Sequence, residues 1–376
     1  MKVALVYDRV NKWGGAERVL LALHELFPEA PLFTSVYDPA GAPWAEKFTV
    51  KTSFLQQFPF AAKHHELIPF LMPIAFETFT FDDYDLVISV TSEAAKGILT
   101  KTKTKHICYC LTPTRYLWSG YDDYFGNGLF SFLTKPVVAY LRKWDKVAAQ
   151  RPDALVAISK EVQSRIKKYY DRESQVVYPP VTLSSWRGND LDRISKVSKK
   201  PRDPIAALQD DSYFLVVSRL SKFTKYKRID LAIQACNELG LPLKIVGTGS
   251  WEPELKAMAG PTIEFLGNLT DEKLVAYYKS CTALIFPGTE DFGLTILEAQ
   301  QFGKPVIAYR GGGAVETIVE GKTGMFFHPQ QVSALKQVLA TFDKKQFKAS
   351  DCKKQSERFN RERFRKDFLM VLEKVL

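Results

Sequence analysis

Hydrophobic and polar residues follow two patterns along this chain of 376 residues. Short runs are apolar at every position, whereas longer stretches carry apolar residues every three or four positions. Short runs of the first kind are typical of strands buried on both faces, as in parallel sheets covered by helices. The predicted strands are Val3–Tyr7, Leu32–Val36, Asp85–Val90, His106–Cys110, Ala154–Ile158, Gln175–Tyr178, Tyr213–Ser218, Leu243–Val246, Thr262–Leu266, Ala283–Phe286 and Pro305–Tyr309.

The amphipathic stretches between these strands predict helices, among them Ala16–Phe27, Arg228–Leu239 and Thr295–Phe302. Alternating strands and helices indicate an α/β protein with doubly wound parallel sheets. Residues 186–210 interrupt the pattern, because they are polar, charged and contain two prolines, as in a linker. We therefore predict an N-terminal domain over residues 1–185 and a C-terminal domain over residues 211–354.

The last segment, Asp351–Leu376, reads as one charged helix. Its apolar stripe is Phe364, Phe368, Val371 and Val375. Such a stripe is typical of a helix that packs on a protein core, and we expect residues from about 355 to 376 to close the fold by packing back on the N-terminal domain. A helix lying on a membrane surface or between the domains is the alternative interpretation.

Composition narrows the class of protein. The chain is 46% hydrophobic and 25% charged, which is typical of folded globular proteins and excludes wholesale disorder and fibrous structure. Its net charge is +10, but the basic residues are spread over both halves. Nucleic-acid binders concentrate their charge on one element, so no nucleic-acid partner is expected. A diffuse basic excess fits an anionic small ligand or an anionic membrane surface.

The remaining composition signals favour a protein without a metal centre or a membrane span. The five cysteines are scattered, and we expect reduced thiols in the cytoplasm. The five histidines lack partners at metal-ligand spacing, so no metal is expected. The chain opens on a strand rather than a signal peptide, and no run of 18 apolar residues occurs.

The strongest local feature is the segment FPGTEDFGLTILEA, which runs from Phe286 to Ala299. A buried strand ends in a Pro-Gly turn, a loop with two acids follows, and Gly293 then opens a helix. The free amides of Gly293, Leu294 and Thr295 can therefore bind an anion. Glu298 can accept hydrogen bonds from sugar hydroxyls, although a favourable interaction with the helix dipole would explain it equally well.

A second feature is the cation cluster that follows the strand Tyr213–Ser218. Parallel sheets place ligands at the carboxyl ends of their strands, and Arg219 and Lys227 lie there. Their charges can neutralise a diphosphate. The alternative is a solvated basic loop.

Glycine-containing loops follow several strands. Gly14 and Gly15 open the first helix but do not form the dinucleotide fingerprint, and by themselves they indicate a turn as readily as a ligand. In the second half the loops contain Gly247 and Gly249, Gly267 with Asn268 and Leu269, and Gly311–Gly313. Because all of these loops lie at one edge of a parallel sheet, they predict a nucleotide site open toward the partner domain.

Several motifs in order along the chain resemble a known family. Glu290 and Glu298 form an E-x7-E pair within EDFGLTILEA, accompanied by GGAERVL, VSRL with YKRIDLAI, GNLTDEKL and GKPVIAYRGGG. With these motifs the chain resembles the family 4 glycosyltransferases. That resemblance implies the GT-B fold, two Rossmann-like domains facing across a cleft, with the acceptor side on the N-terminal domain and the donor site on the C-terminal one. YCLTPTRYLWSGYDDY and VVYPPV are most similar to a bacterial mannosyltransferase-like branch.

The resemblance also implies a reaction. It is a retaining transfer of a hexose from a nucleotide-diphosphate sugar, with GDP-mannose as the first candidate, without a metal or other cofactor. The acceptor would be a glycan or a polyprenyl-diphosphate-linked glycan in cell-surface polysaccharide synthesis. The implied roles are diphosphate binding by Arg219 and Lys227, sugar binding by Glu290, ribose binding by Glu298, and further donor contacts from Gly293, Leu294, Thr295, Gly14, Gly15, Gly247, Gly267, Asn268 and Leu269.

One position departs from the pattern, since Leu111 stands where much of the family has a histidine that contacts the donor sugar. Leucine cannot hydrogen-bond a hydroxyl. Leu111 favours a non-catalytic nucleotide-sugar-binding subunit as an alternative. A nucleotide-sugar 2-epimerase of the same fold is a second alternative, against which the E-x7-E pair and the lack of an acid–base histidine set count. The apolar stretch Leu67–Phe81 and the basic, aromatic run Phe125–Lys146 predict either a surface that docks on anionic lipid or an ordinary core with a solvated helix.

Overall fold

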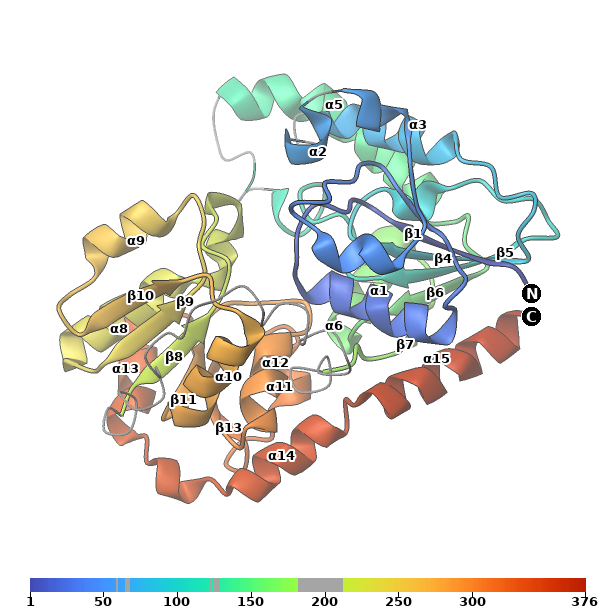
Figure 1. Ribbon diagram of the computed structural model, residues 1–376. Coiled ribbons are helices and arrows are strands. Elements are labelled where there is room, and N and C mark those ends of the chain that lie inside the picture. Colours follow the sequence, from blue (N-terminus) through green and yellow to red (C-terminus); the bar gives the residue numbers. More distant parts are fainter. Residues whose placement is uncertain (59, 65–67, 122–123, 125–128, 182–211) are drawn as a thin grey trace, which may run out of the picture. The chain divides into compact units, whose positions relative to one another are not determined.

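The computed structural model describes residues 1–58, 60–64, 68–121, 124, 129–181 and 212–376 (Figure 1). The chain divides into two compact units. The N-terminal unit is Met1–Pro180 together with Arg361–Leu376, and the C-terminal unit is Val181–Asn360. The predicted linker, residues 186–210, lies outside the described residues.

The N-terminal unit is built on a seven-stranded parallel sheet in the order β3-β2-β1-β4-β5-β6-β7. β1 and β4 are buried at every position, as their largely apolar sequences predict, although β4 also buries Ser89 and Thr91. The edge strand β3 was not predicted, because Lys51 interrupts it and none of its residues is fully buried. The strands are β1 (Val3–Tyr7), β2 (Leu32–Thr34), β3 (Val50–Thr52), β4 (Leu86–Thr91), β5 (Lys105–Cys110), β6 (Ala154–Ala157) and β7 (Gln175–Val176).

Helices cover both faces of this sheet. Figure 1 shows α1 and α15 on one side of it and α2, α3 and α5 on the other. The helix predicted over Ala16–Phe27 is confirmed as α1, displaced by one residue. The helices are α1 (Gly15–Leu26), α2 (Ala61–His64), α3 (Met72–Glu77), α5 (Leu129–Ala148), α6 (Lys160–Tyr170) and α15 (Arg361–Val375), with short 3-10 turns η1 (Pro43–Lys47), η2 (Phe54–Gln57), η4 (Pro69–Leu71) and η5 (Ala95–Gly97).

The C-terminal unit has a six-stranded parallel sheet in the order β10-β9-β8-β11-β12-β13. Its strands are β8 (Phe214–Val217), β9 (Leu243–Val246), β10 (Ile263–Gly267), β11 (Ala283–Phe286), β12 (Val306–Tyr309) and β13 (Gly324–Phe327). The five strands predicted in this half are confirmed. β13 was missed, because it opens on a glycine and two of its four residues are only half buried.

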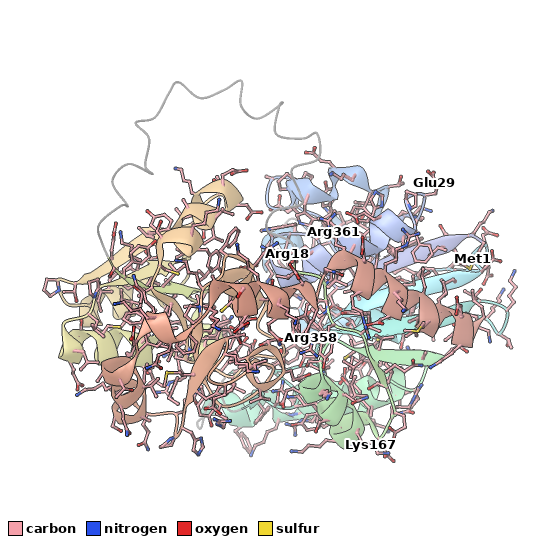
Figure 2. The ribbon with its side chains drawn as sticks, turned by 90° about the horizontal axis from the view of Figure 1, so that it is seen from below. Met1, Arg18, Glu29, Lys167, Arg358 and Arg361 are labelled. Carbon is pink, nitrogen blue, oxygen red and sulfur yellow. The ribbon has the colours of Figure 1, made fainter. Side chains whose placement is uncertain are left out.

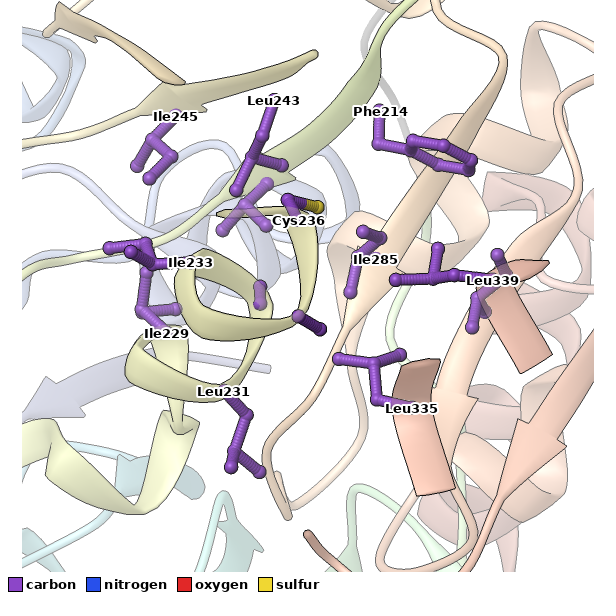
Figure 3. Close-up of a cluster of buried hydrophobic side chains, with 14 of the residues drawn as sticks. Phe214, Ile229, Leu231, Ile233, Cys236, Leu243, Ile245, Ile285, Leu335 and Leu339 are labelled. Atoms are coloured by element: carbon purple, nitrogen blue, oxygen red, sulfur yellow. The ribbon is translucent and has the colours of Figure 1, made fainter. Parts of the chain in front are cut away.

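The helices of the C-terminal unit are α8 (Ile229–Leu239), α9 (Glu252–Met258), α10 (Asp271–Ser280), α11 (Leu294–Gln301), α12 (Ala314–Thr317), α13 (Val332–Thr341) and α14 (Ala349–Glu357), with 3-10 turns η8 (Lys222–Lys227) and η9 (Lys344–Gln346). One face of the sheet is sealed by α8 and α13. Figure 3 shows this core, to which α8 contributes Ile233 and Cys236, β9 contributes Ile245, β11 contributes Ile285 and α13 contributes Leu339.

The single C-terminal helix predicted over Asp351–Leu376 is instead two helices, α14 and α15. Phe359 lies between them, 5% exposed, with its ring centroid 5.7 Å from that of Phe292. The predicted apolar stripe is buried at Phe364, Phe368 and Val371, so this face of α15 packs on protein. Arg361, labelled in Figure 2, fixes the start of α15 through a 2.7 Å contact with Oε1 of Glu25 on α1.

Two properties of the described residues bear on chemistry. None of their helices is long and apolar enough to cross a bilayer. All five cysteines are buried free thiols, and burial raises the pKa of Cys108, Cys236 and Cys281 to about 12. These thiols are therefore protonated core residues rather than nucleophiles.

Candidate functional site

The sheet of the C-terminal unit reverses its strand order between β8 and β11. From β8 the chain proceeds to β9 and β10 on one side and then returns to β11 on the other. The loops that follow β8 and β11 therefore leave the sheet in opposite directions. Ligands of open α/β sheets bind at such a reversal.

The structure brings Lys227 and Glu290 together at this reversal. Lys227 ends η8 in the loop after β8, and Glu290 lies in the loop after β11. Nζ of Lys227 is 2.5 Å from Oε1 of Glu290, and the two side chains are 11% and 26% exposed. The pair places one cation and one carboxylate, both still reachable from solvent, where a charged and hydroxylated ligand would bind.

Close backbone approach holds the two loops in this position. A Cβ atom at Gly288 would overlap Cα of Lys227, so only glycine fits here. The amide of Thr289 donates a hydrogen bond to the carbonyl of Tyr226 at 3.3 Å, and the amide of Gly313 donates to the carbonyl of Glu290 at 2.9 Å. The loops after β8, β11 and β12 are thus linked through the main chain around the Lys227–Glu290 pair.

Arg219, the second predicted diphosphate ligand, is exposed on the loop after β8. Its carbonyl accepts a hydrogen bond from Oγ1 of Thr224 at 3.3 Å, which orders the loop. Within the described part of the chain its guanidinium forms no ion pair, in contrast to Lys227. The structure does not bring Arg219 into contact with Glu290; it leaves the guanidinium available to an anion.

Gly293 caps the N-terminus of α11 with φ of 86°, a left-handed conformation that favours glycine. A Cβ atom there would come 2.9 Å from Cδ1 of Ile296. α11 then begins at Leu294, and Leu294 and Thr295 are half buried at its first turn. Free amides at the start of this eight-residue helix therefore face the same edge as the Lys227–Glu290 pair.

Glu298 lies one turn further into α11 and is only 3% exposed. Its Oε2 accepts a hydrogen bond from the hydroxyl of Tyr278, a fully buried residue of α10, at 2.8 Å. The ring of Tyr278 stacks on Phe302 with centroids 6.0 Å apart. Sequence reasoning missed Tyr278, because nothing in α10 marks it as a partner of a carboxylate 20 residues away.

The other predicted donor residues lie at the ends of β9 and β10. The amide of Gly247 donates to the carbonyl of Gly267 at 2.8 Å, which joins these two loops. Asn268 is exposed, whereas Leu269 packs against the hydrophobic core. Asn268 and the backbone of Gly247 and Gly267 can thus contact a ligand, while the side chain of Leu269 is engaged in packing.

Gly14 and Gly15 belong to the N-terminal unit, where they open α1 after β1. Glu17 in the first turn of α1 is 2% exposed, and its Oε1 accepts a hydrogen bond from the hydroxyl of Tyr7 at 2.7 Å. Burial, together with the charge of Glu17, raises the pKa of Tyr7 well above its ordinary range, so the hydroxyl remains a donor. The Gly14–Gly15 turn is therefore anchored to the end of β1.

Asp8, which sequence reasoning did not single out, lies at the strand-order reversal of the N-terminal sheet, between β1 and β4. It is fully buried and accepts hydrogen bonds from Thr91 Oγ1 and from the amides of residues 92–95, at 2.7–3.0 Å. Burial and the nearby Glu93 raise the pKa of Asp8. The aspartate joins the loops after β1 and β4.

Leu111 follows β5. Its amide donates a hydrogen bond to the carbonyl of Thr91, the last residue of β4, at 2.8 Å, and Leu111 is 9% exposed.

Comparison with known proteins finds glycosyltransferases. Residues 198–359 match the model of the family described as glycosyl transferases group 1. The chain is 26% identical over 216 residues to D-rhamnosyltransferase WbpZ of Pseudomonas aeruginosa. The aligned residues cover 55% of this chain and 52% of that protein. It is 27% identical over 204 residues to O-antigen chain mannosyltransferase C of Escherichia coli, covering 52% and 50% of the two chains. The chain spans about half the length of the relatives it matches.

Among solved structures, Anabaena Alr3699/HepE in complex with UDP-glucose superimposes with a TM-score of 0.70 at 20% identity, over 100% of both chains. A likeness at this level of identity concerns the fold. Two parallel-sheet α/β units and this superposition assign the chain to the GT-B fold, which confirms the predicted fold class.

Proposed function

We propose that this protein is a retaining glycosyltransferase of family 4 that moves a hexose from a nucleotide-diphosphate sugar to a glycan or a polyprenyl-diphosphate-linked glycan. Mannose from GDP-mannose is the first candidate, since one relative is a mannosyltransferase. The observation that carries the proposal is the Lys227–Glu290 pair at the reversal between β8 and β11, beside the free amides of α11. A reaction of this kind contributes to cell-surface polysaccharide synthesis at the cytoplasmic face of the membrane.

In this reaction the bond between the anomeric carbon and the diphosphate oxygen breaks, and its electron pair leaves with the diphosphate. Arg219, Lys227 and the first amides of α11 supply fixed positive charge and dipoles where that negative charge develops. The acceptor hydroxyl bonds to the anomeric carbon on the face that the diphosphate leaves, and its proton passes to the departing phosphate. No protein nucleophile or metal is required.

Specificity for the sugar and the nucleoside rests on different residues. Glu290 accepts hydrogen bonds from the sugar hydroxyls, and Lys227 moves from Glu290 toward the diphosphate as the donor binds. Glu298, held by Tyr278, accepts hydrogen bonds from the ribose. Gly247, Gly267 and Asn268 present main-chain and amide groups to the base. Leucine cannot hydrogen-bond a hydroxyl, so the proposal assigns recognition of the sugar to Glu290 rather than to Leu111.

The test is a thermal-shift titration with GDP, UDP and their mannose, glucose and N-acetylglucosamine conjugates. A ligand at 100 times its dissociation constant adds about 2.7 kcal/mol of stability. We expect one nucleotide family to stabilise the protein and Lys227→Met to abolish that effect. Lys336→Met is the matched control, because Lys336 pairs with Glu238 away from the site. Stabilisation by none of these ligands would refute the donor site.

Transfer is tested next, with the stabilising donor and undecaprenyl-diphosphate-linked oligosaccharides as acceptors. A glycosylated product with retained anomeric configuration supports the proposal. Conversion of the donor to a new nucleotide sugar without any acceptor would instead identify a 2-epimerase. Tight donor binding with neither transfer nor hydrolysis would identify a non-catalytic binding subunit, the function that Leu111 favours.

A further inference from the structure

A second pair of one cation and one carboxylate lies at the strand-order reversal of the N-terminal sheet. Arg9 is in the loop after β1 and Glu93 is in the loop after β4, the two strands between which the order reverses. Nη1 of Arg9 is 2.8 Å from Oε2 of Glu93, and the side chains are 14% and 19% exposed. We call these residues the Arg9–Glu93 pair. Because ligands of open α/β sheets bind at such a reversal, the N-terminal unit has a candidate site of its own.

The main chain of Glu93 is held on both sides by buried groups. Its amide donates a hydrogen bond to Oδ2 of Asp8 at 3.0 Å. Its carbonyl accepts hydrogen bonds from Nζ of Lys96 and, at 3.3 Å, from Oγ1 of Thr114. The charge of Lys96 is itself neutralised by Asp145. The backbone of residue 93 is therefore rigid, and its carboxylate is presented in a fixed position.

The guanidinium of Arg9 is only partly satisfied by the protein. Its Nε is buried without a hydrogen-bond acceptor among the residues that the structure describes. An unsatisfied donor on a buried charged group costs free energy, so its presence in a folded protein calls for an explanation. A ligand hydroxyl fits such a pair, because it accepts from a guanidinium and donates to a carboxylate.

The charges around the pair oppose an anionic ligand. Asp8 and Glu17 are both buried, and both interact electrostatically with Arg9. Together with Glu93, three carboxyl groups of the described chain thus surround one guanidinium. A phosphate or carboxylate placed beside Glu93 would be repelled by a like charge at short range, whereas an uncharged hydroxyl would not.

A small cavity next to Glu93 also fits a hydroxyl group. It is about the size of one water molecule, and Glu93 and Tyr116 line it together with the apolar side chains of Met72 and Pro73. Burial, followed by the charge of Glu93, raises the pKa of Tyr116 well above its ordinary range, so its hydroxyl stays a donor. A cavity of this size with polar and apolar walls accommodates a hydroxyl or hydroxymethyl group rather than a phosphate.

We propose that the Arg9–Glu93 pair recognises the acceptor by its hydroxyl groups and restricts this site to an uncharged sugar terminus. Glu93 accepts hydrogen bonds from the acceptor hydroxyls, while Arg9 orients the carboxylate and donates to a neighbouring oxygen. An acceptor whose terminal unit carries a phosphate or a carboxylate is rejected by the charge of Glu93.

This inference rests on the proposed function, because glycosyl transfer is what makes the bound sugar an acceptor. Its residues are nevertheless distinct from those assigned to the donor. Binding of acceptor analogues in the absence of any nucleotide therefore tests the Arg9–Glu93 pair separately from the donor site.

The first experiment titrates octyl glycosides into the full chain without nucleotide and follows binding by saturation-transfer difference NMR. The uncharged probes are the octyl glycosides of mannose, glucose, galactose, rhamnose and N-acetylglucosamine. The charged probes are octyl glucuronide and octyl mannoside 6-phosphate. We expect at least one uncharged probe to bind, and the charged probes to bind at least about tenfold more weakly, because Glu93 repels them. Binding of no uncharged probe, or equally tight binding of a charged one, would overturn the proposal.

The second experiment repeats the titration with Glu93→Gln, which keeps the shape of the side chain and removes its charge. We expect the uncharged probe to bind at least about tenfold more weakly, because hydrogen bonds to a carboxylate are stronger than those to an amide. The preference for uncharged over charged probes should also narrow. Unchanged affinity and unchanged preference in a folded Glu93→Gln would refute the role of this carboxylate.

Two further variants separate recognition from folding. Arg9→Lys keeps the charge but loses the planar guanidinium, so it should weaken binding of the uncharged probe and still discriminate against the charged ones. The matched control is Glu25→Gln, because Glu25 pairs with Arg361 at 2.7 Å in the last turn of α1, away from the carboxyl ends of the strands. It should bind every probe as the unmodified protein does.

The donor site is checked in the same variants by the thermal shift with nucleotide sugars. Glu93→Gln should keep the full donor-induced shift. A lost shift with retained glycoside binding would count against the donor site alone, and a retained shift without glycoside binding would count against the Arg9–Glu93 pair alone.

Discussion

Lys96 and Asp145 form a buried ion pair in the N-terminal unit, and removing its charge should lower stability strongly. Nζ of Lys96 is 2.5 Å from Oδ1 of Asp145, and both side chains are 1% exposed. Asp145 also accepts hydrogen bonds from Thr114 Oγ1 at 2.9 Å, Trp118 Nε1 at 2.7 Å and the hydroxyl of Tyr170 at 2.8 Å. One carboxylate thus joins α5 to η5, to α6 and to the loop after β5.

The perturbation is Lys96→Met, which keeps the length of the side chain and removes its charge. Burial acts to lower the pKa of Lys96, but the Asp145 carboxylate outweighs it, so the pKa is raised and the lysine is charged. Without it, Asp145 is a buried carboxylate that retains only neutral donors. Breaking a buried pair in this way costs about 3–5 kcal/mol, several times an exposed pair.

The assay is a double-mutant cycle with Lys96→Met, Asp145→Asn and the double variant, measured by urea unfolding. Trp13, Trp44, Trp118 and Trp144, four of the six tryptophans, lie in the N-terminal unit, so intrinsic fluorescence follows its transition. We expect the double variant to be more stable than the sum of the single losses predicts, by at least about 2 kcal/mol. The result reports directly on the structure that holds the loop after β5.

The control cycle uses an exposed pair of the same type. Lys101 and Asp82 are 2.5 Å apart with side chains 66% and 42% exposed, and Lys101→Met with Asp82→Asn should show a coupling below about 1 kcal/mol. Equal couplings in the two cycles, or additive losses at Lys96 and Asp145, would refute the reasoning that burial makes this pair a determinant of the loop.

Three further predictions concern the site and the core. Tyr278→Phe should lower the free energy of unfolding by about 1.5–3 kcal/mol, because Glu298 loses its buried hydrogen-bond donor. The same variant should bind the nucleotide sugar more weakly in calorimetry, and Tyr277→Phe is the neighbouring control. Gly288→Ala should abolish activity and lower the melting temperature followed by circular dichroism, since the new methyl would come 2.4 Å from Cα of Lys227 and force the two loops apart. Burial, then Arg151 and Arg172, lower the pKa of His106 to about 3, whereas in the unfolded chain it titrates near 6.5. The unfolded state alone binds this proton as pH falls, so stability should drop by about 2 kcal/mol from pH 7.5 to pH 5, and His106→Gln should flatten this dependence.

Most strands were predictable, because burial on both faces of a parallel sheet favours apolar residues at nearly every position. β1 illustrates the rule, whereas β3 and β13 were not predicted because they are less buried edge strands of their sheets. The break between α14 and α15 was not predicted either. Phe359 in this break is buried against Phe292, a residue more than sixty positions earlier in the chain. Local periodicity cannot encode such a contact.

The sequence by itself determined the chemistry available at the predicted donor site, since the E-x7-E spacing, the cations after β8 and the glycine loops are all local features. Only the tertiary structure decided which of these groups meet. It paired Lys227 with Glu290 across 63 residues, buried Glu298 against Tyr278, and left Arg219 exposed. It also placed Asp8 and Asp145 at the centre of buried hydrogen-bond networks, although no sequence pattern marks either residue as important. The physical reason is that strand order in a parallel sheet, rather than order along the chain, sets which loop ends are neighbours.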